Sequence, residues 1–229
     1  MNILAFDTCF DGCSACVAER RGGVVFELAE RFERFQAGHA QRLIPMIGEV
    51  MQQARLSFDQ IERIAVTVGP GTFTGTRIGI AAARAFALAC GAKTLGVSSL
   101  AVMAEAARTQ VTAEALAVVV DARRDEVYAQ LFGPGGGLDV RSPPQLLSIE
   151  DAARLGSGPI VFVGSGSAAV ADAVREGRDA LAALPDLLPD SVALARIAAA
   201  LEAAEAPLVP LYLRPPDAKP QVGHAIARA

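Results

Sequence analysis

The segment that most constrains the fold is an apolar strand that runs into a glycine-rich turn and then into a long helix. It spans residues 64–77 and reads IAVTVGPGTFTGTR. Glycines allow backbone angles that a side chain would forbid, and the helix points its free N–H groups back at the turn. A P-loop needs a lysine after its last glycine, whereas Thr76 and Arg77 follow Gly75. The segment therefore predicts a unit of an α/β protein suited to anion contact or close helix packing, and excludes an ordinary P-loop.

Apolar patterning predicts elements of both kinds along the chain. In the first half we expect strands at 2–8, 13–19, 24–31, 62–68 and 94–97, with helices at 40–55, 74–90 and 99–108. Strands joined by hairpins, followed by strands alternating with helices, indicate a mixed sheet in an α/β layer fold. A later helix is expected at 191–205, capped by Asp190 or Ser191.

The second half repeats features of the first. Residues 3–8 (ILAFDT) and 118–122 (VVVDA) each form an apolar strand with an aspartate at its end, and a second aspartate follows four positions later in both. Residues 65–71 (AVTVGPG) and 160–166 (IVFVGSG) both run into G-x-G. Two matches in the same order predict a duplicated unit. We expect lobes at 1–110 and 111–214 and a flexible tail at 215–229.

Composition narrows the function. The net charge of −4, the aromatic content of 5% and the absence of tryptophan argue against a chain that grips nucleic acid by itself. The start MNIL lacks the charged region of a signal peptide. The best candidate for a transmembrane segment, 78–91, is short and interrupted by Arg84. We expect a soluble, cytoplasmic protein without membrane contact.

Three of the four cysteines have spacing that resembles an iron–sulfur motif. Cys9, Cys13 and Cys16 form C-x-x-x-C-x-x-C. Alternation along a strand would send Cys13 and Cys16 to opposite faces, but a cluster needs its thiolates to converge. We therefore predict that these cysteines pack as small apolar residues.

The helix at 40–54 carries a broad apolar stripe. Such a stripe normally packs into the protein's own core, but a face widened by methionine also suits an adaptable partner surface. The residues alone leave both interpretations open. The stripe comprises Leu43, Ile44, Met46, Ile47, Val50, Met51 and Ala54.

The helix at 74–90 carries small residues at four-residue spacing. They are Gly75, Gly79, Ala83 and Ala87. Glycine within a helix costs about 0.5–1 kcal/mol relative to alanine. Close approach of a neighbouring helix would offset that cost.

Taken together, several segments resemble the TsaB (YeaZ) family, the bacterial subunit needed to make threonylcarbamoyladenosine in tRNA. The matching segments are 3–8, 39–45, 68–79, 96–100 and 121–128, with a weaker match at 210–214. The combination covers roughly the first 130 residues and is specific, although each segment alone is not. The resemblance implies the actin-like ATPase (ASKHA) fold, with two related lobes that each have a mixed sheet and flanking helices.

The resemblance also implies a non-catalytic scaffold. Such a subunit pairs with and activates its catalytic paralogue TsaD, the ATPase TsaE joins the pair, and tRNA is met only indirectly. The pairing surface is formed by the first two helices, and the same face could support a homodimer when the partner is absent. The implied contact residues are His39, Leu43, Ile44, Met46, Ile47, Val50, Met51, Gly75, Gly79 and Ala83.

One comparison separates the two paralogues. TsaD holds its metal with a histidine-x-x-x-histidine pair, and alignment through Gly96-Val97 places Ser99 and Met103 at those positions. Neither replaces imidazole as a metal ligand. We expect no metal, no cofactor and no catalytic residue.

The resemblance places Asp7 where actin-like ATPases keep an aspartate for metal-bound phosphate. One interpretation is a residual nucleotide site formed by Asp7, Thr8, Gly69 and Gly71; the other is that Asp7 caps the following turn. No serine or cysteine nucleophile lies at a sequence spacing that would indicate His39 as a catalytic base. We therefore expect His39 to contact the partner or to have a role at the helix N-terminus. The competing function is an autonomous ASKHA kinase or ATPase, which would bind ATP and magnesium unaided.

Overall fold

The computed structural model describes residues 1–202 and 207–214. The helix expected at 191–205 ends earlier, at Ala200, because Leu201 has an extended backbone. Residues 203–205 and the expected tail at 215–229 lie outside the described residues. The first half contains β1 (Asn2–Asp7), β2 (Gly12–Arg21), β3 (Val24–Arg34), α1 (His39–Ala54), η1 (Phe58–Gln60), β4 (Arg63–Thr67), α2 (Phe73–Cys90), β5 (Lys93–Val97) and α3 (Ser99–Ala107). The second half contains β6 (Leu116–Asp121), β7 (Glu126–Phe132), η2 (Gly136–Leu138), β8 (Gln145–Ser148), α4 (Ile149–Ala152), β9 (Ile160–Val163), α5 (Ser167–Asp172), β10 (Ala180–Ala183) and α6 (Ser191–Ala200).

The strands form two five-stranded sheets with the same topology. Their orders are β3-β2-β1-β4-β5 and β10-β9-β6-β7-β8. In each sheet three consecutive strands form an antiparallel meander. On its other side, the first strand of the meander pairs in parallel with a fourth strand, which pairs in parallel with a fifth. Asp7 and Asp121 end the equivalent central strands β1 and β6. The predicted pair of mixed sheets with flanking helices is confirmed.

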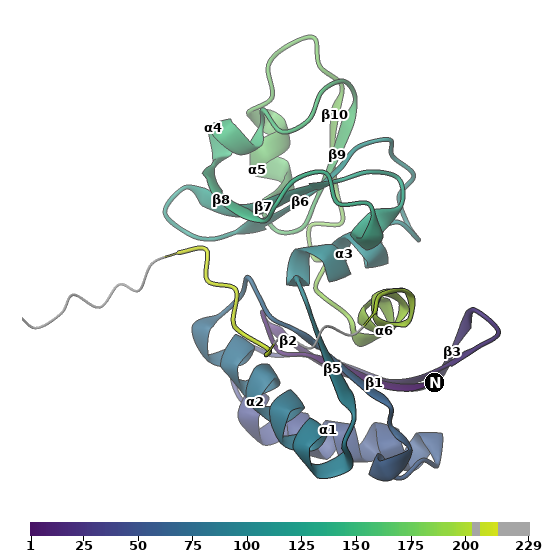
Figure 1. The fold of residues 1–229 in the computed structure, drawn as a ribbon. Coiled ribbons are helices and arrows are strands. Elements are labelled where there is room, and N and C mark those ends of the chain that lie inside the picture. The colour runs from purple at the N-terminus through teal and green to yellow at the C-terminus, as the bar shows by residue number, and fades with distance from the viewer. Residues whose placement is uncertain (203–206, 215–229) are drawn as a thin grey trace, which may run out of the picture.

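The helices and sheets stack in layers (Figure 1). Helices α1 and α2 cover the outer face of the first sheet, α4 and α5 cover the outer face of the second, and α3 and α6 lie between the sheets. We call the first sheet with α1 and α2 the first lobe, and the second sheet with α4 and α5 the second lobe. Strand β1 is buried on both faces, because Ile3 and Ala5 enter the central core and Leu4 and Phe6 enter the core beneath α1 and α2.

Period-two alternation also places the cysteines of β2. Cys13 lies in the core beneath α1 and α2, and Cys16 lies in the central core on the opposite face. Burial raises the pKa of the Cys13 thiol to about 12. Both side chains act as small apolar residues, as predicted.

The last described helix returns to the first lobe. Asp190 caps α6 by accepting a hydrogen bond from the Ala193 N–H at 2.7 Å, and the helix packs on β1 and β2. The Arg63 guanidinium in β4 donates to the carbonyl oxygens of Ala198 and Leu201 at the end of α6. The division at residues 110 and 111 stays a prediction. Within the described residues, no helix is both long and apolar enough to cross a bilayer.

Candidate functional site

Most of the predicted contact stripe of α1 is buried in the chain's own core. Five of its side chains are inaccessible or nearly so and pack against the first sheet, whereas Ile44 is 52% exposed. A side chain without accessible surface cannot contact another protein in this conformation. The expectation that these five side chains contact a partner is therefore wrong, and the core interpretation of the stripe is correct for them. The five are Leu43, Met46, Ile47, Val50 and Met51.

His39 lies at the start of α1 and is also buried. Its Nε2 lies 2.9 Å from the carbonyl oxygen of Phe10, and its ring lies 4.8 Å from the Phe35 ring. The imidazole therefore ties the beginning of α1 to the turn between β1 and β2. His39 thus holds the start of α1 through the turn between β1 and β2 and not by capping the helix, and its contact with a partner stays a prediction.

The small residues of α2 face the chain's own sheet. Gly75, Gly79 and Ala83 are buried. A Cβ on Gly75 would collide with the carbonyl oxygen of Thr8, and one on Gly79 would lie 2.8 Å from the Thr8 hydroxyl. The expectation that these three residues contact a partner is therefore wrong, because their small size allows α2 to approach the end of β1.

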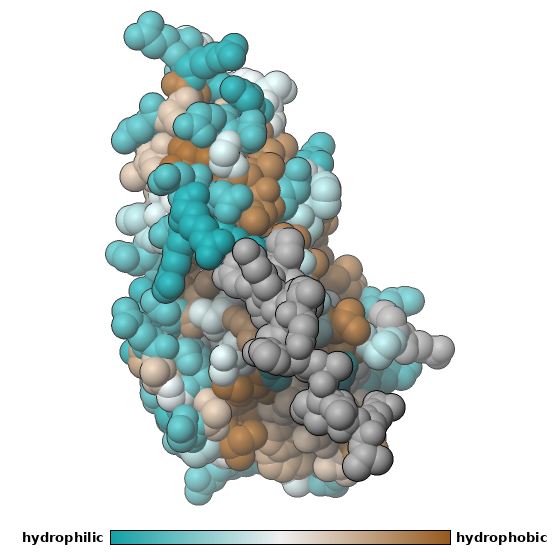
Figure 2. All heavy atoms as spheres, turned by 90° about the vertical axis from the view of Figure 1, so that its left-hand side faces the viewer, coloured by the Kyte–Doolittle hydropathy of each residue, from teal (hydrophilic) through white to brown (hydrophobic). Residues whose placement is uncertain are grey.

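Of the expected contact residues only Ile44 lies on the outward surface of α1 and α2, and the other residues there were not expected from the sequence. Leu88 is 89% exposed. Gly48 lies in the middle of α1, and a Cβ there would meet no atom within 4 Å. Figure 2 shows hydrophobic side chains in the lower part of the molecule, where Figure 1 places these helices. We call this surface the outer helix face and define it by the exposed residues Ile44, Gly48, Ala81, Ala85 and Leu88.

A salt-bridge network fixes α1 against the edge of the sheet. The Arg42 guanidinium contacts Glu33 on β3 at 2.6 Å and Glu49, two turns further along α1, at 2.7 Å. Its hydrogen bonds hold the pKa of both carboxyl groups below their usual values. The network adds to the buried stripe of α1 in holding this helix, and with it the outer helix face, beside β3.

The glycine turn is filled by the chain itself. Gly69 has a φ of 105°, and a Cβ on it would lie 2.8 Å from the carbonyl oxygen of Leu211. A Cβ on Gly71 would collide with the carbonyl oxygen of Cys9, which accepts a hydrogen bond from the Thr72 N–H at 2.6 Å. The Thr72 hydroxyl caps α2 by accepting from the Gly75 N–H at 3.1 Å. Of the two predicted uses of this turn, these contacts correspond to close packing.

Asp7 does not face an open site. It is 1% exposed, and its Oδ1 accepts hydrogen bonds from the Cys9 N–H at 3.2 Å and from the Thr67 hydroxyl. Oδ2 has no hydrogen-bond partner among the described residues. Burial raises the pKa of Asp7 to about 7, so the carboxyl group is protonated in a large fraction of the molecules near neutral pH. A neutral, enclosed carboxyl group is a poor ligand for a magnesium ion.

The four residues of the expected nucleotide site therefore do not come together around a cavity. The Thr8 hydroxyl donates to the carbonyl oxygen of Gly75 at 2.7 Å, and the carbonyl oxygen of Leu211 occupies the space beside Gly69. Only Gly71 of the four lines the cleft between the lobes. The interpretation of Asp7 as the cap of its own turn is correct, because Oδ1 binds the N–H two residues on.

The cleft between the lobes has a volume of about 770 Å³. Its lining balances acidic and basic side chains, and Met103 forms part of the wall. The charged groups are Asp11, Asp121 and Asp186, and Arg34, Arg123 and Arg214.

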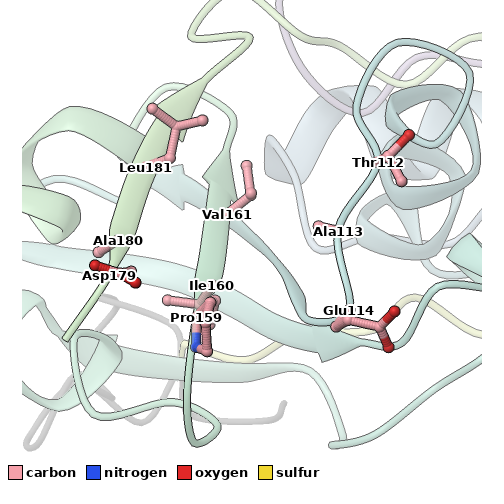
Figure 3. A pocket seen from close by; sticks show the side chains of 9 residues that line it. All are labelled: Thr112, Ala113, Glu114, Pro159, Ile160, Val161, Asp179, Ala180 and Leu181. Carbon is pink, nitrogen blue, oxygen red and sulfur yellow. The ribbon is translucent and has the colours of Figure 1, made fainter.

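A second cavity, of about 440 Å³, lies at the edge of the second sheet (Figure 3). It is mainly apolar, with Val161 and Leu181 from β9 and β10 and the carboxyl groups of Glu114 and Asp179 at its rim. Nothing in the sequence pattern indicated this cavity.

Helix α3 presents Ser99 and Met103 one turn apart. Both are fully buried. The Ser99 hydroxyl donates to the carbonyl oxygen of Pro70 at 2.5 Å, so it is committed to a backbone contact. A hydroxyl in such a contact and a thioether are poor ligands for a hard or borderline metal ion.

Comparisons with known proteins agree on one family. The model of the family "TsaD: tRNA N6-adenosine threonylcarbamoyltransferase" matches residues 14–210. The Escherichia coli K12 protein "tRNA threonylcarbamoyladenosine biosynthesis protein TsaB" is 33% identical, over 93% of this chain and 95% of that protein. The uncharacterized protein Rv3421c of Mycobacterium tuberculosis H37Rv is 37% identical, over 95% and 94% of the two chains. The solved structure of YeaZ from Pseudomonas aeruginosa superposes with a TM-score of 0.77 at 30% identity, covering 93% of this chain and 99% of that one.

Proposed function

The chain belongs to the TsaB (YeaZ) family, and from this membership we propose that it is a non-catalytic subunit in the formation of threonylcarbamoyladenosine in tRNA. It pairs with a TsaD-like catalytic subunit and activates it, and a TsaE-like ATPase joins the pair. Contact with tRNA comes through the catalytic subunit. The observation that carries the proposal is the similarity to the Escherichia coli TsaB protein over nearly the full length of both chains.

Two residues of α3 support the proposal that this subunit is non-catalytic. Family resemblance places the metal-binding histidines of the catalytic paralogue at the positions of Ser99 and Met103. Here the first side chain is bound to the carbonyl oxygen of Pro70 and the second is buried in the central core. This chain thus lacks the ligand pair that the transfer chemistry of its paralogue uses.

The outer helix face is the pairing surface that we propose. Leu88 is almost fully exposed, and burying its side chain against a partner would stabilise the pair through the hydrophobic effect. Gly48, Ala81 and Ala85 lack bulky side chains, so helices of a partner could approach closely. The same face would support a homodimer through a self-complementary contact when the catalytic subunit is missing.

Reconstituted threonylcarbamoyl transfer tests the function. The assay combines tRNA, the TsaD-like and TsaE-like proteins of the same organism and the activated threonylcarbamoyl donor. It is run with this chain, without it, and with this chain but without the TsaD-like protein. We expect product only when both proteins are present. Equal activity without this chain would refute the proposal, and an ATP-dependent phosphotransfer screen would then test the autonomous kinase or ATPase alternative.

Paired surface variants test the proposed face separately. Ile44→Glu combined with Leu88→Glu should leave the chain folded, as measured by circular dichroism, and should abolish co-elution with the TsaD-like protein. Leu181→Glu is the matched control, because Leu181 is 59% exposed on β10 in the second lobe. Its co-elution should equal that of the wild type. Normal co-elution of the double variant would exclude the outer helix face while leaving the proposed function intact.

A further inference from the structure

Residues 207–214 form a strap that runs along the first lobe and ends at the second. The strap includes the PLYLR stretch at 210–214. Figure 1 shows it in yellow, passing α2 on its way to the second lobe. Leu208 is buried in the core beneath α1 and α2, and the Leu211 N–H donates to the carbonyl oxygen of Val68 at 2.7 Å. The strap therefore has a firm attachment beside the glycine turn, where Gly69 leaves room for Leu211.

Side chains of α2 hold the middle of the strap. The Tyr212 ring stacks on Phe73, with the ring centroids 5.5 Å apart. The Arg77 guanidinium lies 3.6 Å from the Phe73 ring centroid and donates to the Tyr212 hydroxyl at 2.7 Å. Arg84, two turns further along α2, donates to the carbonyl oxygen of Leu208. All of these contacts join the strap to the first lobe.

The end of the strap crosses to the second lobe. The Arg214 guanidinium lies 2.5 Å from the carboxylate of Glu126, the first residue of β7, and 3.4 Å from the carbonyl oxygen of Arg123. Arg214 also lines the cleft between the lobes. The central core joins the lobes on the side of α3 and α6, and Figure 1 shows the strap on the other side of the molecule.

We propose that residues 207–214 are a clasp that holds the two lobes at a fixed angle, and that the ion pair between Arg214 and Glu126 is its releasable end. The two attachments differ in kind. The first-lobe end has a buried leucine and a backbone hydrogen bond, whereas the second-lobe end is an ion pair whose side chains are 21% and 37% exposed. Partly exposed ion pairs contribute little compared with buried contacts, so this end opens first. Its release would widen the cleft while the strap stays attached to α2. The inference does not depend on the proposed function.

Distance measurement between the lobes by double electron–electron resonance tests the clasp. Spin labels at Gln53→Cys on α1 and Ala168→Cys on α5 use exposed positions, one in each lobe. Cys90→Ala removes the partly exposed native thiol, and the three other cysteines are fully buried. Labelled chain is diluted into unlabelled chain, so that only distances within one molecule contribute.

We expect a narrow distance distribution in the otherwise unaltered chain. Arg214→Gln and Glu126→Gln should each broaden it toward longer distances. The charge-exchanged variant, Arg214→Glu with Glu126→Arg, should narrow it again. Arg154→Gln is the control, because it breaks an ion pair with Asp151 at 2.7 Å that lies entirely within the second lobe. Its distribution should match that of the unaltered chain.

A salt series provides a second measurement that needs no substitution in the strap. Raising the salt concentration from about 0.05 M to about 1 M screens exposed ion pairs. The distribution of the unaltered chain should broaden, whereas that of Arg214→Gln should not change further. A distribution unchanged in Arg214→Gln, or a charge-exchanged variant as broad as the single variants, would overturn the clasp.

Discussion

At the scale of the residue, Asp7 illustrates how burial changes a carboxyl group. Its pKa is raised to about 7 in the folded chain, against about 4 in an unfolded one. Between these values the unfolded chain has lost the proton that the folded chain still holds. The free energy of unfolding should therefore fall as the pH rises from about 4 to about 7, and should level off above it.

Asp7→Asn removes this titration. Between about pH 5 and pH 8 the variant should show a smaller fall in the free energy of unfolding with rising pH than the wild type, because only Glu30 and Asp190, whose pKa values burial also raises, still contribute to that fall. At about pH 8 it should be more stable than the wild type by a few kcal/mol, on the order of the shift itself. Urea denaturation across that pH range measures both effects. Asp11→Asn changes an exposed carboxyl group four residues away and should keep the wild-type profile. Parallel profiles for wild type and Asp7→Asn would contradict the assignment.

Two helical glycines should respond to the same substitution with opposite signs. Gly48→Ala meets open space and should raise the free energy of unfolding by about 0.5–1 kcal/mol. Gly75→Ala drives a methyl group into the carbonyl oxygen of Thr8 and should lower it by about 1–3 kcal/mol. Urea titration of both variants decides the matter. If both substitutions changed the free energy of unfolding in the same direction, the space around each glycine would not be what distinguishes the two positions.

Sequence reasoning reached some of these residues and missed others for a physical reason. Period-two alternation is local, so it correctly separated Cys13 from Cys16. The contact between Asp7 and its own turn is local too. Whether a glycine faces open space or a distant backbone depends on tertiary packing, so the pattern could not distinguish Gly48 from Gly75.

At the scale of the element, the predicted helices and strands of the first half match the structure to within a few residues. The helix expected at 40–55 spans His39–Ala54, and the one expected at 74–90 spans Phe73–Cys90. Their periodicity is a property of consecutive residues. An apolar stripe does not say what covers it, so the sequence left core and partner contact as alternatives for α1. The exposed residues of α2 could not be predicted from the sequence, because alanines occur on both faces of this helix and its small-residue spacing marks only the buried one.

Neighbouring positions on α1 should therefore give opposite folding outcomes. Leu43→Glu places a charge in a core where the side chain has no accessible surface, and this should unfold the chain or leave it insoluble. Ile44→Glu changes a half-exposed side chain and should leave the melting temperature within a few degrees of wild type. Circular dichroism melts of the two variants compare them directly. A soluble, native Leu43→Glu chain would reopen the interface interpretation of the stripe.

At the scale of the whole molecule, the two sheets share one core. The central cluster takes residues from both sheets and from α3 and α6 between them. We therefore expect unfolding in one cooperative transition, with equal calorimetric and van't Hoff enthalpies. Leu194→Ala should lower the free energy of unfolding by about 2–5 kcal/mol and move that transition as a unit. Two separate calorimetric peaks would show that the lobes unfold independently.

The internal repeat predicted two sheets with the same topology. It did not predict that the C-terminal part of the chain returns to the first sheet. Helix α6 comes from the second half of the sequence and packs on β1 and β2. The strap at 207–214 then follows α2 before Arg214 reaches Glu126. These long-range paths depend on which surfaces remain uncovered after the sheets form, and a repeat in the sequence carries no information about that.

The position of α6 has a consequence for how the protein emerges from the ribosome. Strand β1 precedes α6 by more than 180 residues in the chain, yet each needs the other to cover its apolar face. The inner face of the first sheet therefore stays uncovered by α6 until residues 191–200 have been made. Domains usually fold in the order of their synthesis, but here the N-terminal lobe must wait for its C-terminal helix. Its early strands are exposed to aggregation and chaperone binding while the residues between β1 and α6 are translated.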